Sequence, residues 1–231
     1  MKKTKIICTM GPNADNRDTL LELAKNGMDI ARFNFSHGDH EEQKARMDLL
    51  KSVRQEVKKP IAILLDTKGP EIRTGLLANG GKVTLREGES FTLTSEEILG
   101  DETRVSQTYA NLAKDVKPGD RILIDDGLIG LTVEEIHGCE IVCKVLNGGE
   151  LGQRKGINVP NVSVKLPAIT QKDREDIIFG IEQGIDFIAA SFVRDADAIK
   201  EIKQILKDHN ASHIDVIAKI ENSEGIHDID R

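Results

Sequence analysis

Charged and polar side chains occur together at the end of one apolar run of the sequence. The run 28–36 closes with ARFNFS, and because side chains alternate along a strand, Arg32, Asn34 and Ser36 share one face while Phe33 and Phe35 share the other. A polar triplet on a buried strand is costly unless it is satisfied, so we expect it to line the ligand end of a barrel. A structural polar network inside the barrel is the alternative.

Two further runs end in the same way. The run 61–67 places Asp66 and Thr67 at its carboxyl end, and the run 215–222 places Lys219 and Glu221 on one face, with Ile220 turned away toward helices. An internal ion pair of Lys219 and Glu221 is possible. Desolvating two charges often costs more than their attraction returns, so the pattern favours a ligand or metal partner.

These residue types are suited to handling phosphate. Glu221 is a hard oxygen ligand for Mg²⁺, Lys219 suits a phosphoryl oxygen or a developing negative charge, and Arg32 and Arg73 suit phosphates. Side-chain oxygens that would together form a cage for a hard cation belong to Asn34, Ser36, Asp66 and Thr67.

Other positions carry weaker signals. Asp126 stands in an Asp-Gly pair, which is first of all a hairpin turn. His37 follows the polar triplet and is expected to approach a ligand, whereas the remaining histidines, including His40, are expected to be solvated. The Gly-Pro pair at 69–70 fits either a ligand site or a simple domain junction.

The elements that must position these residues follow a βα rhythm. Strands are expected over 5–10, 28–36, 61–67, 186–193 and 215–222, and helices over 18–27, 41–58 and 195–210, with a further helix capped by Thr170, with Asp173 at N3, and closed by Gly184. Between them, short runs separated by Gly-rich turns predict an inserted antiparallel β domain. The expected division is 1–70, 71–166 (inserted) and 167–231.

Five parallel strands fit either an open doubly wound sheet or most of an eight-stranded barrel. No G-x-G-x-x-G turn follows the first strand, which weakens the dinucleotide-binding version. The predicted fold is therefore α/β, an incomplete (β/α)8 TIM barrel with about five of its eight strands.

Composition excludes several classes of protein. The 231 residues are 39% hydrophobic and 31% charged, which is ordinary for a globular chain, and a net charge of -7 argues against a nucleic-acid partner. No run is long and apolar enough for a membrane span. The three cysteines, Cys8, Cys139 and Cys143, lack metal-ligand or redox spacing. We expect a cytoplasmic protein whose cysteines are structural.

Together these segments closely resemble the pyruvate kinase family. CTMGP, ARFNFSHG, LLDTKGPEIRTG, DDGLI, LNGG, KGINVP, ASFVR and AKIENSEG occur in that family's order and approximate spacing along the whole chain. Met10 is a mild departure from the usual CTIGP. The resemblance implies phosphoryl transfer from phosphoenolpyruvate to ADP, giving pyruvate and ATP in the last step of glycolysis, on a TIM barrel interrupted after its third strand by an all-β lid domain.

The resemblance also implies a role for each candidate. Arg32 would hold the substrate phosphate, and Lys219 would stabilise the transferring phosphoryl group and the enolate. Glu221 would be one of two carboxylates on Mg²⁺ or Mn²⁺, and Glu71, after the Gly-Pro pair, implies dependence on K⁺. The implied K⁺ ligands are Asn34, Ser36, Asp66 and Thr67. The implied nucleotide contacts are Arg73, Lys155, Asn34, Pro12, His37 and Asp126.

By the same resemblance, the second Mg²⁺ carboxylate, the last three barrel strands and a C-terminal regulatory domain lie beyond Arg231. We therefore expect the N-terminal portion of a homotetrameric enzyme, without turnover on its own. Two alternatives stay open: a module that only binds nucleotide or phosphate, and a Mg²⁺-dependent keto-acid lyase on the same barrel.

Overall fold

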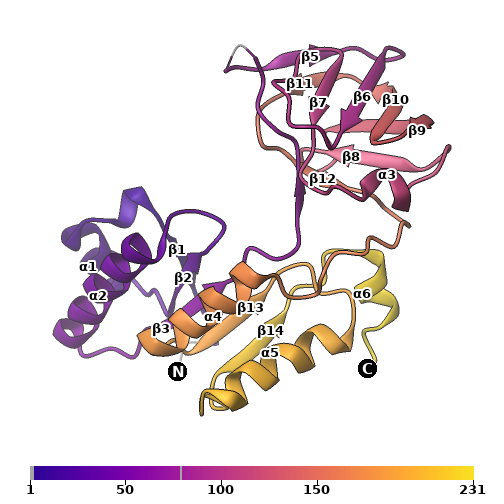
Figure 1. The fold of residues 1–231 in the computed structure, drawn as a ribbon. Coiled ribbons are helices and arrows are strands. Elements are labelled where there is room, and N and C mark those ends of the chain that lie inside the picture. Colours follow the sequence, from indigo (N-terminus) through magenta and orange to yellow (C-terminus); the bar gives the residue numbers. More distant parts are fainter. Residues whose placement is uncertain (1–2, 79) are drawn as a thin grey trace. The chain divides into compact units, whose positions relative to one another are not determined.

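The chain divides into two compact units. The computed structural model describes residues 3–78 and 80–231. Unit 1 comprises Met1–Pro70 and Pro167–Arg231, and unit 2 comprises Glu71–Leu166. In Figure 1, unit 1 therefore has the colours of both ends of the sequence, and unit 2 has those of its middle. Unit 2 is an insertion between two segments of unit 1.

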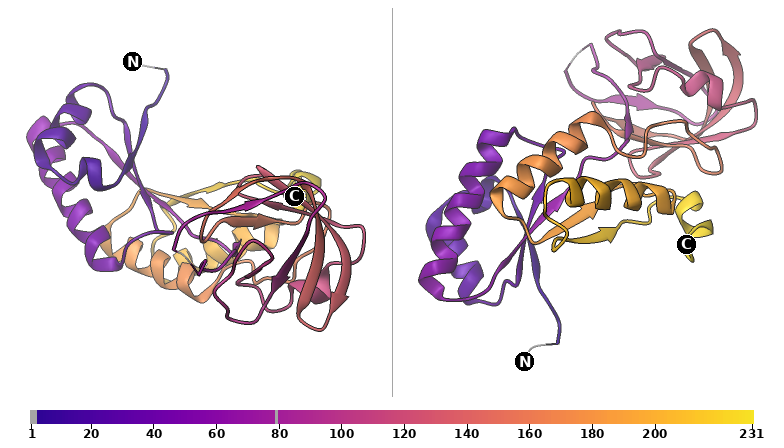
Figure 2. Two further views of the ribbon diagram at one scale, coloured as in Figure 1. Left: turned by 90° about the horizontal axis from the view of Figure 1, so that it is seen from above. Right: turned by 60° about the horizontal axis from the view of Figure 1, so that its bottom comes forward.

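Unit 1 is built on a five-stranded sheet in the order β1-β2-β3-β13-β14. The strands are β1 (Ile7–Met10), β2 (Ile30–Asn34), β3 (Ala62–Asp66), β13 (Phe187–Ala190) and β14 (Asp215–Ala218). Every neighbouring pair is parallel. The α/β prediction with five parallel strands is confirmed, and the curl of the sheet in Figure 2 is that of an incomplete barrel.

Four helices cover the sheet of unit 1. They are α1 (Arg17–Lys25), α2 (His40–Val57), α4 (Gln171–Gln183) and α5 (Ala196–Asp208). Helix α1 packs beside α2, α2 beside α4, and α4 beside α5, all on the outer face of the sheet (Figure 2). Two short elements, η1 (Pro12–Ala14) and α6 (Ser223–His227), follow β1 and β14. Helices α1, α2, α5 and α6 follow strands β1, β2, β13 and β14 of the sheet, so these strand-to-helix turns share one edge of it.

Helix α4 has the caps that its sequence predicts. The Thr170 hydroxyl accepts from the Asp173 backbone N–H at 3.0 Å, and the Asp173 carboxylate accepts from the Thr170 N–H at 3.1 Å. The helix ends at Gly184 with φ of 71°, a backbone conformation that favours glycine. Asp173, which is 1% exposed, also accepts from the Gly69 N–H at 2.9 Å. One buried carboxylate thus joins the segments of unit 1 on either side of the insertion.

The core of unit 1 lies between the sheet and its helices. Phe33 and Phe35 are 0% and 1% exposed, as their predicted position on the apolar face requires. Other fully buried members include Leu20, Met28, Met47, Leu50, Leu65, Ile177, Ile188 and Ile202. Burial of this apolar area, which comes from both segments of unit 1, is the main stabilising contribution to the unit.

Unit 2 is an all-β unit with its own core. Its main sheet has the order β4-β12-β8-β9-β10-β6-β7, and β11 pairs separately with β5. Its elements are β4 (Ile72–Arg73), β5 (Val83–Leu85), β6 (Ser90–Thr94), β7 (Arg104–Ser106), α3 (Leu112–Asp115), β8 (Arg121–Ile124), β9 (Ile129–His137), β10 (Glu140–Asn147), β11 (Gly149–Leu151) and β12 (Gly156–Asn158). The antiparallel prediction is confirmed except at β6 and β7, which run parallel.

Four strands of unit 1, namely β2, β3, β13 and β14, end earlier than predicted. Strand β2 stops at Asn34, so Ser36 lies in the following turn, and β14 stops at Ala218, so Lys219 and Glu221 follow the strand instead of belonging to it. The chain then enters α6, which Asn222 caps. Ile220, which was predicted to face helices, is 38% exposed, and its Cγ2 would lie 3.3 Å from a Cβ added to Gly225 of α6.

Candidate active site

The candidate residues of unit 1 gather at the carboxyl edge of the sheet. Strands β2, β3, β13 and β14 are consecutive neighbours, so the residues that follow them lie side by side. The register pairs Asn34 with Asp66, and Asp66 with Ala189. Residues predicted from separate runs of the sequence therefore meet in one place.

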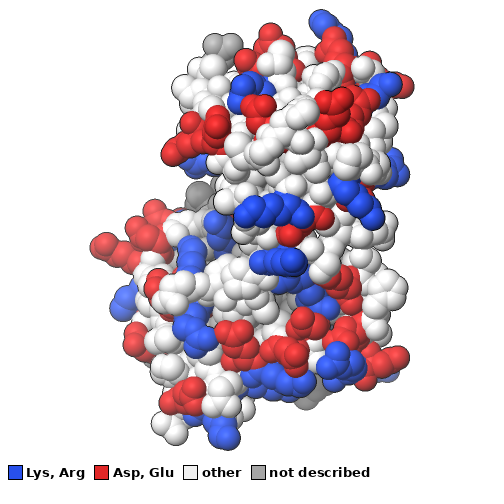
Figure 3. All heavy atoms as spheres, turned by 45° about the vertical axis from the view of Figure 1, so that its right-hand side comes forward, with Lys and Arg blue, Asp and Glu red and all other residues white. Residues whose placement is uncertain are grey.

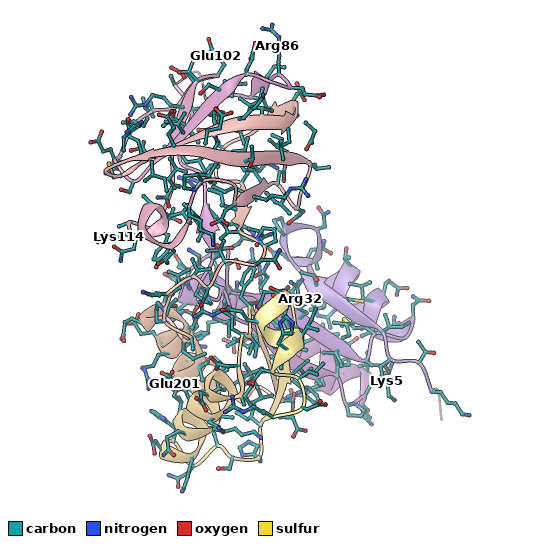
Figure 4. All side chains as sticks on the ribbon, turned by 90° about the vertical axis from the view of Figure 1, so that its right-hand side faces the viewer. Lys5, Arg32, Arg86, Glu102, Lys114 and Glu201 are labelled. Carbon is teal, nitrogen blue, oxygen red and sulfur yellow. The ribbon has the colours of Figure 1, made fainter. Side chains whose placement is uncertain are left out.

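Asp66 is the centre of this group. Its side chain is 2% exposed, and Arg32 donates to Oδ2 from Nε at 2.7 Å and also from Nη2. Lys219 Nζ lies 3.1 Å from Oδ1. Arg32, labelled in Figure 4, also donates to the Thr9 hydroxyl at 2.8 Å. A buried carboxylate requires such partners, and here one cation within β2 and one just after β14 converge on it.

Lys219 makes a second pair of contacts. Its Nζ donates to Ser191 Oγ at 2.8 Å and lies 3.4 Å from Glu221 Oε1. Glu221 Oε2 in turn accepts from the Phe192 N–H at 2.9 Å. Lys219 and Glu221 remain neighbours although both lie beyond the strand, so the internal ion pair that the sequence left as the alternative is present here.

The backbone at this edge adopts uncommon conformations. Phe192 has φ of +56°, which is a genuine outlier for an aromatic residue, and Gly69 has φ of +69°. A Cβ on Gly69 would lie 2.9 Å from both the Cβ and the carbonyl oxygen of Ser191. A side chain at position 69 would therefore clash with Ser191.

The proposed K⁺ ligands lie at the ends of β2 and β3. Asn34 Oδ1 accepts from the Ser36 N–H at 3.0 Å, and the Thr67 carbonyl lies 2.7 Å from Ser191 Oγ. Amide, hydroxyl, carboxylate and carbonyl oxygens make up this donor set, which is the kind that a hard monovalent cation takes. The residues present therefore fit a K⁺ ion by their chemistry.

Glu221 fits Mg²⁺ only as part of a larger ligand set. In the described part of the chain, no group of three or more His, Cys, Asp or Glu side chains is placed to hold a metal ion. Mg²⁺ commonly binds one or two carboxylates and completes its shell with water and substrate phosphate. A single carboxylate at residue 221 is consistent with that pattern.

Pro12 and His37 lie at the ends of the first two strands. Pro12 opens η1 directly after β1, and His37 occupies the turn after β2, where its N–H contacts the Asn34 carbonyl at 3.4 Å. Both residues therefore share the carboxyl edge with Asn34.

In unit 2, the predicted nucleotide contacts surround β4 and β12. Arg73 pairs with Gly156 in the register, and its side chain donates to Glu71 at 2.6 Å. This hydrogen bond raises the pKa of the Arg73 guanidinium above its ordinary value, with smaller charge contributions from Glu71 and Asp126. Lys155 Nζ lies 2.9 Å from Asp125 Oδ2. The Asp-Gly pair that begins at Asp126 lies in the predicted hairpin turn between β8 and β9, where Asp125 and Asp126 have φ of 54° and 55°.

Two polar residues of the site were missed in the sequence. Ser191 follows β13, and its N–H donates to Thr67 Oγ1 at 3.0 Å while its hydroxyl contacts Lys219. Thr9 lies in β1 and accepts from Arg32. A hydroxyl at the end of a predicted parallel strand is the signal that could have identified Ser191, as it identified Ser36 and Thr67.

Charge is mixed over the surface. On the face in Figure 3, Lys and Arg alternate with Asp and Glu in each unit, as the modest net charge of -7 suggests. Positive charge for an anionic ligand must therefore come from local groups such as Arg32 and Lys219. Within residues 3–78 and 80–231, no helix combines the length and apolar character needed to cross a membrane.

Comparison with known proteins agrees with this geometry. The family model described as pyruvate kinase, barrel domain, matches residues 1–231. The chain is 50% identical to a pyruvate kinase of Clostridium acetobutylicum over 100% of its length, and 52% identical to one of Geobacillus stearothermophilus over 99%. It spans 49% and 39% of those two relatives. The match over every residue shows that this chain belongs to the pyruvate kinase barrel-domain family.

Proposed function

We propose that this chain takes part in phosphoryl transfer from phosphoenolpyruvate to ADP, giving pyruvate and ATP. The observation that carries the proposal is the convergence of Arg32 and Lys219 on Asp66 at the carboxyl edge of the sheet. Phosphoryl transfer needs positioning and charge neutralisation more than a nucleophilic side chain. Cations fixed by a buried carboxylate supply both.

In this proposal, Arg32 binds the phosphate that is transferred, and Lys219 stabilises the enolate that is left behind. Arg32 binds the phosphate of phosphoenolpyruvate, because a guanidinium can give two parallel hydrogen bonds to its oxygens. As the bond from phosphorus to the enol oxygen breaks and a bond to the terminal oxygen of ADP forms, negative charge is left on the enolate, which becomes pyruvate by taking a proton from water at its methylene carbon. Lys219 stabilises that charge, since its ammonium is held by Asp66 and Ser191 before substrate arrives.

The proposed ions neutralise the remaining negative charge. K⁺ would be held by Asn34, Ser36, Asp66 and Thr67, and Mg²⁺, or Mn²⁺ in its place, by Glu221 together with substrate oxygens. When bound, a divalent ion polarises the phosphoryl oxygens as a Lewis acid. Glu221 contributes a carboxylate that already has one oxygen fixed by the Phe192 N–H.

We propose nucleotide contacts within each unit taken by itself. In unit 2, Arg73 and Lys155 would bind nucleotide phosphates, with Asp126 beside them. In unit 1 the proposed contacts are Pro12, Asn34 and His37. The compartment we propose is the cytoplasm, which suits the free state of all three cysteines, and the assembly we propose is a homotetramer.

Calorimetry with phosphoenolpyruvate in the presence of Mg²⁺ and K⁺ tests the substrate site. Arg32→Met should weaken binding by roughly ten- to a hundredfold, because hydrogen bonds to charged groups contribute about 1.5–3 kcal/mol. The matched control is Lys200→Met, which removes an exposed cation of α5 in the same unit. Equal affinity in the two variants would count against the proposal.

Calorimetry with ADP tests the nucleotide contacts separately. Arg73→Ala combined with Lys155→Ala should abolish most of the heat. The control is Lys82→Ala combined with Arg86→Ala, which removes the same charge at exposed positions of unit 2. Arg86 lies at the far end of that unit from β12 (Figures 1 and 4). Turnover in a lactate-dehydrogenase-coupled assay then separates a catalyst from a module that only binds.

A further inference from the structure

Residues outside the candidate site hold the turn that carries Ser36. The turn after β2 contains the backbone of Asn34 to His37, and three of its carbonyl groups accept hydrogen bonds from helix side chains. Gln43 of α2 donates from Nε2 to the Asn34 carbonyl at 3.1 Å and to the His37 carbonyl at 2.9 Å. Lys172 of α4 donates to the Phe35 carbonyl at 3.2 Å.

The position of Gln43 leaves one of its buried polar atoms unsatisfied. Its side chain belongs to a residue that is 2% exposed, and Oε1 is buried with no hydrogen-bond partner among the described residues. Buried polar atoms are normally satisfied, so an exception needs a reason. The reason here is that Nε2 serves two backbone carbonyls of the turn at once.

Lys172 is itself fixed by a buried carboxylate. Asp176 is 1% exposed and accepts from Lys172 Nζ at 2.6 Å, while its other oxygen lies 2.8 Å from His40 Nε2. His40 stacks on Phe179 with ring centroids 4.3 Å apart. The prediction that His40 is solvated holds in part, because its side chain is 43% exposed while its ring contacts Asp176 and Phe179. Its position at the start of α2 links that helix to α4.

We propose that Gln43, Lys172, Asp176 and His40 form a brace that positions the oxygen ligands of Asn34 and Ser36 for a monovalent cation. The carbonyls of Asn34 and Phe35 precede Ser36, and the carbonyl of His37 follows it. Fixing all three leaves the peptide of Ser36 little freedom, and its N–H is further held by Asn34 Oδ1. The four brace residues are positioning residues, since they act through the turn and not on the substrate.

Simple packing of α2 against α4 does not account for the brace. The His40–Asp176 contact alone would join the two helices, whereas the bonds of Gln43 and Lys172 end on backbone carbonyls of the turn. Groups that orient metal ligands in this way commonly change metal affinity by about 10–100-fold when they are removed. The inference rests on the proposed function for the identity of the cation.

The test compares two lysines that each pair with an aspartate four residues along a helix. Lys172→Met removes the donor to the turn, and Lys44→Met removes the exposed partner of Asp48 on α2. Hydrogen exchange at the amides of Ser36 and His37, followed by NMR, reports on the turn. Titration with Tl⁺, a K⁺-sized probe observed by ²⁰⁵Tl NMR in nitrate buffer, reports on the cation site.

We expect Lys172→Met to speed exchange at both amides and to weaken Tl⁺ binding about tenfold, with Lys172→Arg restoring most of the loss. Lys44→Met should change neither. Equal exchange in the two methionine variants, or unchanged Tl⁺ affinity in Lys172→Met, would overturn the brace. Absence of Tl⁺ binding in the unmodified chain would instead overturn the proposed cation site, and with it the cation part of this inference.

Discussion

Gly69 should be intolerant of even the smallest side chain. Its φ of +69° is a region where a residue with a Cβ pays about 1–2 kcal/mol. The added Cβ would also lie 2.9 Å from the Ser191 carbonyl oxygen, closer than real Cβ contacts, and 3.0 Å from the Phe192 ring, which is tighter than most of them. Overpacking of this kind typically costs about 1–3 kcal/mol. Gly69→Ala should therefore lower the free energy of unfolding of unit 1 by about 2–5 kcal/mol.

Gly184→Ala provides the matched control. This glycine lies in the same unit with nearly the same φ, +71°, but an added Cβ would meet nothing within 4 Å. Only the conformational cost of about 1–2 kcal/mol should remain. The difference between the two variants isolates the contact with Ser191.

Urea unfolding followed by circular dichroism at the helix band measures the effect on unit 1, because the four long helices of the described residues all belong to that unit. The same Gly69→Ala variant should also bind phosphoenolpyruvate more weakly, since moving Ser191 disturbs a partner of Lys219. Equal destabilisation in Gly69→Ala and Gly184→Ala would refute the reasoning from close approach.

Three further outcomes follow from buried or charged groups. Asp173→Ala leaves its hydrogen-bond donors without an acceptor and should destabilise unit 1 by about 2–4 kcal/mol in urea, whereas the exposed Asp197→Ala should have little effect. Burial raises the pKa of the Cys143 thiol from 9.0 to about 12, so the free energy of unfolding should fall as pH rises from about 9 toward 12. Iodoacetamide at pH 8 should modify this thiol only after unfolding, as mass spectrometry would show. Glu221→Gln retains an acceptor for the Phe192 N–H but loses the charge, so calorimetry should find the same phosphoenolpyruvate affinity with and without Mg²⁺.

Local signals predicted most of the fold. The Thr170 cap, the closing Gly184 and the burial of Phe33 and Phe35 all follow from rules that act within a few residues. Strand ends were less predictable. The polar alternation that suggested a strand through Glu221 continues past Ala218, where the last strand of the sheet ends. Alternation alone cannot tell a strand from the extended residues that follow it.

Contacts between distant residues explain what the sequence could not supply. The contact of Asp176 with His40 could not be predicted, because the two residues are far apart in sequence and meet only when α4 packs beside α2. Ser191 joins the site through the register of β13 against β3, which brings its N–H to Thr67 Oγ1. Such pairings depend on the assembled sheet, whereas Asp66 and Lys219 could be singled out because a charge at a strand end is informative by itself.

The pairing of β4 with β12 bears on how this chain reaches its folded state. Strands β3 and β13 must meet although all of unit 2 lies between them, and such distant pairings slow folding because a long loop must close first. Once unit 2 has formed from its own contiguous segment, the register of Arg73 with Gly156 draws its two ends together. Each halving of the flexible length lowers the closure cost by about 0.6 kcal/mol. If unit 2 folds first, it therefore shortens the flexible chain that must close before β3 can pair with β13.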